Sequence, residues 1–178
     1  MMKSKLKIIA LVTAAVAAAT VLSGCRDAAR DKENAANVEI SDSMRLSAEE
    51  YRTSLLSAFN SWTDENKTIA KALYGSGEYY LDRDSFTGTV ERSRSYLNGL
   101  KEIYPPKKYD KQHNEILLSL DTEYKWLSTA EDVYTALEDK DQAKFDELTE
   151  ILQKYGNESK FPLAVVEMAN KLKQEITE

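Results

Sequence analysis

Apolar residues recur every three or four positions over most of this chain, and that spacing constrains its fold more than any other feature. The pattern begins near Ser47 and continues almost to the C-terminus. A helix brings residues at this spacing onto one face, where they can be buried together. The alternating pattern of a half-buried strand occurs only in the short stretch 37–40. The sequence therefore predicts an all-α protein.

Five helical segments are expected, covering about 47–74, 84–104, 108–138, 141–155 and 159–176. Ser47-Ala48-Glu49-Glu50 is a capping-box pattern, and Pro105-Pro106 ends the second segment because proline disfavours helix at the residue before it. Gly156-Asn157 is a stop signal, after which Ser159 is expected to cap a restart. Short connections favour antiparallel neighbours, so we expect an up-and-down bundle of four to five helices.

The apolar stripes of these segments form the candidate core. Its expected members are Leu55, Phe59, Trp62, Ile69 and Leu73; Phe86, Val90, Leu97, Leu100 and Tyr104; Ile116, Leu120, Leu127, Tyr134 and Leu137; Phe145, Leu148, Ile151 (or Leu152) and Tyr155; and Phe161, Val165, Met168 (or Ala169), Leu172 and Ile176. In the first stripe Asn66 stands where an apolar residue would continue the pattern.

The first 25 residues combine three lysines, an apolar run from Ile8 to Val21 and the tetrapeptide Leu22-Ser23-Gly24-Cys25. Fourteen apolar or small residues suit the central region of a signal peptide, whereas a membrane-spanning helix needs about 20. The tetrapeptide resembles the lipobox of bacterial prolipoproteins. This resemblance implies that residues 1–24 are removed and that the Cys25 thiol carries lipid. The alternative, an uncleaved membrane anchor, would need a longer apolar run.

Lipidation at Cys25 would anchor the chain stably, because two acyl chains hold a membrane far better than one. The expected location is then the outer, extracytoplasmic face of the cell membrane. Residues 25–46 are expected to form a flexible tether, since their first part mixes both charges with alanine and lacks aromatic residues. Residues 47–178 are expected to form a single helical-bundle domain.

Charge narrows the range of partners. The chain has 24 Lys and Arg against 30 Asp and Glu, a net charge of −6, and removal of three lysines with residues 1–24 leaves −9. An acidic surface argues against nucleic acid and favours basic partners. Since Cys25 is the one cysteine, its lipidation leaves no thiol for a disulfide.

Motifs for catalysis or cofactors are weak, so we assign no catalytic residue, metal ligand or cofactor. His113 is the one histidine, and zinc sites draw three or four ligands from cysteine, histidine and acids. We expect His113 to lie at the core boundary, hydrogen-bonded near a helix start. Carboxylates are too numerous on solvated helix faces for an acid–base pair to be selected.

Tyrosines near loops are the remaining lead. Tyr74, Tyr79 and Tyr80 flank the glycines at 75 and 77 and are the candidate partner-binding residues, because aromatic side chains supply contact area at little entropic cost. The alternative is that these tyrosines border a helical core with their hydroxyls in water.

Residues 104–113, Tyr-Pro-Pro-Lys-Lys-Tyr-Asp-Lys-Gln-His, followed by an amphipathic helix, resemble a recurring pattern in uncharacterised helical lipoproteins of Gram-positive bacteria. That resemblance implies a helical bundle and assigns no activity. The expected function is a non-catalytic binding module that recognises an envelope protein, a peptide or a glycan. The alternative is a small-molecule receptor or hydrolase-type enzyme whose site combines scattered carboxylates and tyrosines.

Overall fold

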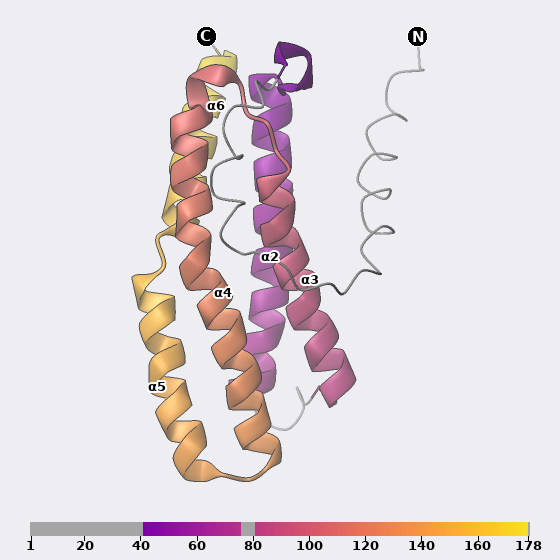
Figure 1. The fold of residues 1–178 in the computed structure, drawn as a ribbon, viewed down its shortest axis with the longest axis vertical. Helices are drawn as coiled ribbons and strands as arrows, with labels where there is room; N and C mark the ends of the chain where they lie inside the picture. The colour runs from indigo at the N-terminus through magenta and orange to yellow at the C-terminus, as the bar shows by residue number, and fades with distance from the viewer. Residues whose placement is uncertain (1–40, 76–80, 178) are drawn as a thin grey trace, which may run out of the picture. The chain divides into compact units, whose positions relative to one another are not determined.

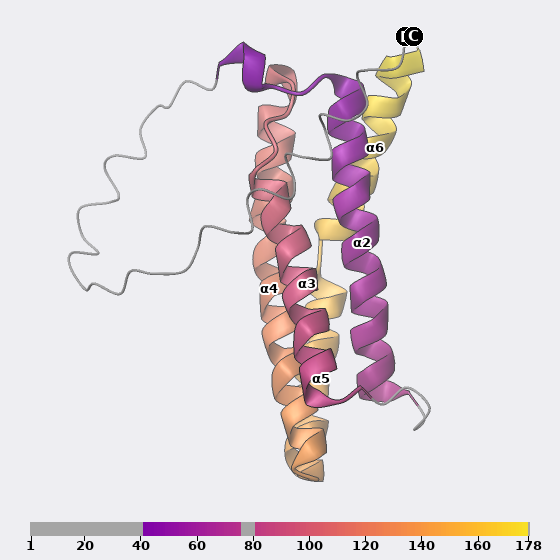
Figure 2. The same ribbon diagram turned by 90° about the vertical axis from the view of Figure 1, so that its right-hand side faces the viewer.

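The computed structural model describes residues 41–75 and 81–177, and the described chain is an all-α antiparallel bundle (Figures 1 and 2). Its α-helices are α2 (Ala48–Tyr74), α3 (Arg83–Lys101), α4 (Asp110–Glu138), α5 (Gln142–Glu158) and α6 (Phe161–Thr177), with 3₁₀ turns η2 (Asp42–Met44) and η4 (Lys107–Tyr109). The predicted fold class is confirmed. No helix within the described residues is long and apolar enough to cross a membrane.

Two shorter helices share the fourth arm of the bundle. α5 packs on the half of α4 nearest their connecting turn, and α6 continues in the same direction against α2 and the other half of α4 (Figures 1 and 2). The predicted antiparallel order of the helices is therefore present, with five helices in four arms. The break between α5 and α6 falls at Ser159 and Lys160.

Three of the helices begin with a side-chain cap. The Ser47 hydroxyl oxygen accepts a hydrogen bond from the backbone N–H of Glu50, whose carboxylate accepts one from the Ser47 N–H, and Asp82 and Asp141 cap α3 and α5. Ser159 is the exception to the prediction. Its hydroxyl donates to the Glu123 carboxylate instead, because Glu123 is buried beside it.

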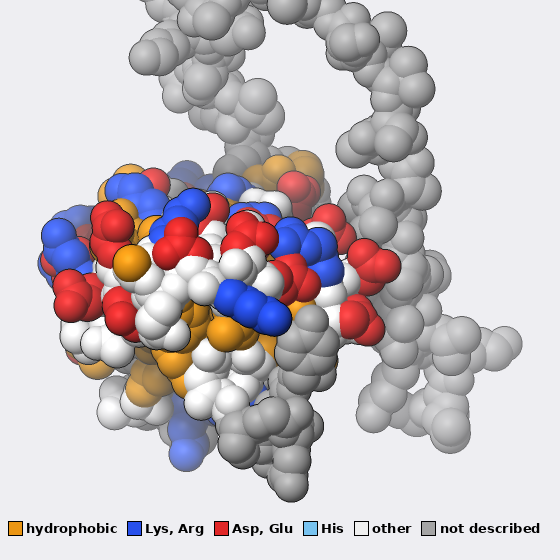
Figure 3. Space-filling view, turned by 90° about the horizontal axis from the view of Figure 1, so that it is seen from below, with side chains coloured by type: hydrophobic (Ala, Val, Ile, Leu, Met, Phe, Trp, Pro, Cys, Tyr) orange, Lys and Arg blue, Asp and Glu red, His pale blue; other side chains and the backbone are white. Residues whose placement is uncertain are grey.

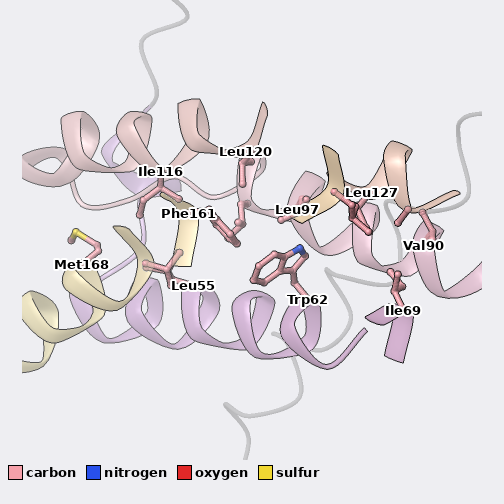
Figure 4. Packing of buried hydrophobic residues seen from close by; sticks show 14 of the residues in the cluster. Leu55, Trp62, Ile69, Val90, Leu97, Ile116, Leu120, Leu127, Phe161 and Met168 are labelled. Atoms are coloured by element: carbon pink, nitrogen blue, oxygen red, sulfur yellow. The ribbon is translucent and has the colours of Figure 1, made fainter. Parts of the chain in front are cut away.

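A single hydrophobic core runs along the bundle axis. Its largest fully buried side chains include Tyr51, Leu55, Ile69, Phe86, Leu97, Leu120, Leu127, Tyr134 and Phe161. Figure 4 shows Trp62 between Leu55 and Ile69 on α2, with Phe161 of α6 facing it. The Trp62 and Phe161 rings meet edge to face, with centroids 4.9 Å apart. Aromatic pairs in this geometry gain more than their buried area alone provides.

Some predicted core positions are not in the core. Leu137 and Ile176, near the ends of α4 and α6, are 38% and 43% exposed. Of the predicted α5 stripe only Leu152 is fully buried, because α5 packs chiefly on α4. Asn66 does occupy the seam as predicted, since its amide oxygen accepts a hydrogen bond of 2.7 Å from Ser93 on α3.

Hydrogen bonds between distant parts of the sequence lie at both ends of the bundle. The Pro105-Pro106 turn lies beside the start of α2, where the Leu46 N–H donates to the Tyr104 carbonyl over 2.9 Å. At the opposite end, the Tyr134 hydroxyl donates to the Leu81 carbonyl over 2.5 Å and links the α4 terminus to the start of α3. Leu46 and Leu81, the described residues just before α2 and α3, are thus hydrogen-bonded to distant parts of the chain.

The last residues of the predicted tether pack on the bundle. Arg45 forms two hydrogen bonds with the Asp110 carboxylate, of 2.5 and 3.0 Å, and a third of 2.9 Å with the Pro105 carbonyl. Leu46 packs against the core. Residues 41–46 therefore belong to the compact unit that begins at Ile40. The predicted signal peptide, the predicted lipidation site Cys25 and residues 25–40 of the predicted tether lie outside the described residues.

Candidate functional site

An open groove of about 330 Å³ lies on the side of the bundle where α5 passes α2 and α4. It exists because α5 packs chiefly on α4 and leaves space between its flank and the end of α2. The lining residues come from all three helices: Tyr74, Trp126, Leu152, Gln153, Gly156 and Asn157. The groove presents two aromatic side chains and two amides, and it is therefore a candidate binding surface.

Tyr74 is the last residue of α2 and forms one wall. Its side chain is 48% exposed, and partial burial raises the pKa of the phenol, an effect that the nearby Thr149 hydroxyl of α5 partly offsets. The ring thus spans the space between α2 and α5. A phenol that keeps its proton near neutral pH can both donate and accept a hydrogen bond.

Trp126 of α4 forms the second aromatic surface. It is partly buried and packs against the core, and it lies opposite Gly156 of α5. A Cβ built at Gly156 would be 3.8 Å from the Trp126 Nε1 atom, an ordinary contact distance. A larger side chain at position 156 would therefore extend into the space beside the indole. Glycine keeps the indole accessible from the groove.

The α5 flank supplies the polar part of the groove. Gln153 and Asn157 are four residues apart, so they lie one above the other on the same helix face. Each amide offers two donors and an acceptor oxygen. Leu152 forms the floor but is only 1% exposed, because it is packed into the core. A ligand would therefore meet mainly rings and amides.

Of the predicted partner-binding residues, the structure places Tyr74 in this groove. Tyr79 and Tyr80 lie outside the described residues. Trp126, Gln153 and Asn157 were not among the residues predicted from the sequence. The one signal for Trp126 was its position directly before the stripe residue Leu127, which puts a tryptophan at the edge of the core. Nothing in the sequence marks the two amides, because such residues are common on solvated helix faces.

His113 lies near the other end of the bundle and is buried rather than at the core boundary, with 4% of its surface exposed. A hydrogen bond of 2.9 Å joins its Nδ1 atom to the Tyr51 hydroxyl of α2, which confirms the predicted hydrogen-bonded role. Burial lowers the pKa of His113, although the Leu100 backbone and Asp110 partly offset the effect. Burial also raises the pKa of Tyr51, so both side chains are neutral near pH 7.

Glu123 is the buried acid of the described chain, with 4% exposure. It lies on the inner face of α4, and the Ser159 hydroxyl at the α5–α6 break donates to its carboxylate. Burial raises the pKa of Glu123, and the Ser159 hydrogen bond offsets only part of that effect. The pair joins α4 to the junction between α5 and α6.

A smaller hollow of about 190 Å³ lies between α4 and α6 at the end that contains Pro105. Its lining carries two acids, Glu115 and Glu167, and one base, Lys171. Across residues 41–75 and 81–177, no three histidine, cysteine, aspartate or glutamate side chains come together as a set of metal ligands.

Charged and uncharged side chains are unevenly distributed over the bundle. Seen from the end where α4 turns into α5, charged side chains crowd one part of the surface, while hydrophobic and uncharged polar side chains share another (Figure 3). The fold and groove together define an all-α antiparallel bundle with a lateral aromatic groove. The chain matches no family model, no curated protein and no solved structure.

Proposed function

We propose that this protein is a lipid-anchored binding module of the cell envelope, held at the outer face of the cell membrane by lipid on Cys25. The lateral groove of α2, α4 and α5 is the observation that carries the binding role. Two aromatic side chains and two amides are held there by helices of a packed bundle, and sites on rigid elements are better ordered than sites on loops. The lipobox resemblance of residues 22–25 supports the anchor.

The packed bundle favours binding over catalysis. A hydrolase that uses two carboxylates needs both in one site, typically about 5–10 Å apart. Glu123 is the acid that the described chain buries, and its carboxylate is joined to a serine rather than to a second acid. A small-molecule receptor or hydrolase-type enzyme stays the alternative, and a second acid acting with Glu123 would be its signature.

The anchor is tested by metabolic labelling with an alkyne fatty acid followed by membrane fractionation. We expect label on the wild-type protein and on Ser23→Ala, which keeps a small residue in the lipobox. Cys25→Ser should lose the label and accumulate as the longer precursor. Equal labelling of Cys25→Ser and the wild type would contradict the anchor.

The binding role is tested by photocrosslinking at the cell surface, with the crosslinker placed at Gln153. Crosslinked products should disappear with Tyr74→Ala and with Trp126→Ala but persist with Leu118→Ala, which removes an exposed side chain from another part of α4. A Tyr79→Ala, Tyr80→Ala double variant extends the test to the predicted loop tyrosines. Products that survive both groove substitutions would contradict the proposed groove.

A further inference from the structure

Among the residues that the structure describes, the six that line the groove of α2, α4 and α5 are uncharged. A cationic or anionic ligand would lose hydration on entering and would find no opposite charge among the lining side chains. The lining therefore favours a neutral ligand.

The exposed side chains of the groove distinguish between two classes of neutral ligand. An apolar peptide helix needs a groove of exposed aliphatic side chains to bury its anchors. Leu152, the aliphatic residue of the lining, is 1% exposed and so offers almost no surface. The surfaces that a ligand can reach are the Tyr74 and Trp126 rings and the Gln153 and Asn157 amides.

We propose that this groove binds a neutral carbohydrate chain, an assignment that rests on the proposed binding function. A pyranose ring has an apolar C–H face that packs on an aromatic ring, and hydroxyl groups around its edge that donate and accept hydrogen bonds. Tyr74 and Trp126 supply the rings. Gln153 and Asn157 supply donors and acceptors four residues apart along α5.

The size of the groove fits a short segment of a carbohydrate chain. A volume of about 330 Å³ is at the lower end of small-molecule sites, which span roughly 300–1,000 Å³. The groove is open to solvent rather than enclosed, so a polysaccharide can cross it with a short stretch of sugars in contact. Binding to such an open site is expected to be weak for a free oligosaccharide and stronger for a polymer that meets many tethered copies.

The two tryptophans provide a site-specific measurement. The Trp126 indole lines the groove, whereas Trp62 is 7% exposed and belongs to the core. Full-length protein in a detergent without a sugar headgroup is titrated with chitotetraose, maltotetraose and cellotetraose, and the indole N–H resonances are followed by NMR. Trp126→Phe assigns the groove resonance, and the Trp62 resonance reports any change in the core.

We expect at least one tetrasaccharide to shift the Trp126 resonance while leaving that of Trp62 in place. Tyr74→Ala should weaken binding of that sugar at least about tenfold, as expected for an aromatic contact in a binding site. Tyr74→Phe, which keeps the ring, and Leu118→Ala, which lies outside the groove, should bind within about twofold of wild type. Because Tyr74 ends its helix and is half exposed, its substitutions leave the core intact.

Two results would overturn the carbohydrate assignment. One is the absence of a Trp126 shift with all three sugars, and the other is undiminished sugar binding by Tyr74→Ala. A hexalysine peptide is titrated in parallel, and a Trp126 shift with this peptide alone would make the groove a peptide site. If the carbohydrate assignment fails in any of these ways, loss of surface crosslinking by the groove variants would still support the proposed binding module. Crosslinking that persists would remove the proposed function itself.

Discussion

The buried hydrogen bond between Tyr51 and His113 gives a direct test of how the core is held together. Tyr51→Phe deletes the hydroxyl, keeps the ring and leaves the His113 Nδ1 atom without its partner 2.9 Å away. An unpaired buried polar group costs about 1–3 kcal/mol. For a folded unit of this size, that loss lowers the melting temperature by roughly 3–10 °C.

The assay is urea unfolding of the segment Ile40–Glu178, which forms one compact unit, followed by circular dichroism. Tyr51→Phe, His113→Phe and the double variant complete a double-mutant cycle. Residues in direct contact show coupling of about 0.5–3 kcal/mol. If the two substitutions are additive within about 0.5 kcal/mol, the pair contributes no specific interaction and the reasoning fails.

The same pair predicts a pH dependence with a definite sign. Burial lowers the pKa of His113 below its usual value of about 6.5, so the unfolded chain takes up the proton first as the pH falls. The stabilising contribution is therefore complete above about pH 6.5 and is lost as the pH falls towards the lowered pKa. His113→Phe should remove this decline between about pH 7.5 and 5.5. An unchanged slope would contradict a neutral buried histidine.

Two further predictions concern Glu123 and the α4–α5 turn. Burial raises the pKa of Glu123, so its ionised form destabilises the fold. Glu123→Gln should therefore raise the melting temperature at about pH 7.5, and this gain should shrink as the pH falls through the raised pKa of Glu123. A gain that does not depend on pH would contradict this reasoning. Lys140 has φ of 58°, a left-handed conformation that favours glycine, so Lys140→Gly should stabilise by about 1 kcal/mol in thermal unfolding. Lys144→Gly, inside α5, should destabilise by about 1 kcal/mol, and equal effects of the two substitutions would refute the turn argument.

Helix positions could be predicted closely because their signals are local. The spacing of Ser47 and Glu50 indicates the start of α2. The end predicted from Pro105-Pro106 was less close, because α3 ends at Lys101 rather than at Tyr104. A break was predicted at Gly156-Asn157, but α5 continues to Glu158 and the break lies at residues 159–160. The role of Ser159 was not predicted. Its hydroxyl can pair either with a nearby backbone N–H or with Glu123. Glu123 is 36 residues away in sequence, and only the tertiary structure brings it within reach.

The candidate site was predictable only in part. Tyr74 was selected because it precedes a glycine-containing loop, and the structure places it in the groove. Trp126 and Gln153 could not be selected, since their place in the groove depends on how α5 packs relative to α2. The offset of one short helix on a longer one is set by side-chain packing and by the position of the break.

The sequence by itself determined the helical class, the order of the arms and a predicted lipid anchor at Cys25, because periodicity, caps and motifs act over a few neighbouring residues. Tertiary structure decided which apolar positions are buried, how His113 and Glu123 are partnered, and where an uncharged aromatic groove forms. Each of these depends on distances between residues of different helices. Such distances follow from packing the whole bundle around one core, and no local stretch of sequence contains them.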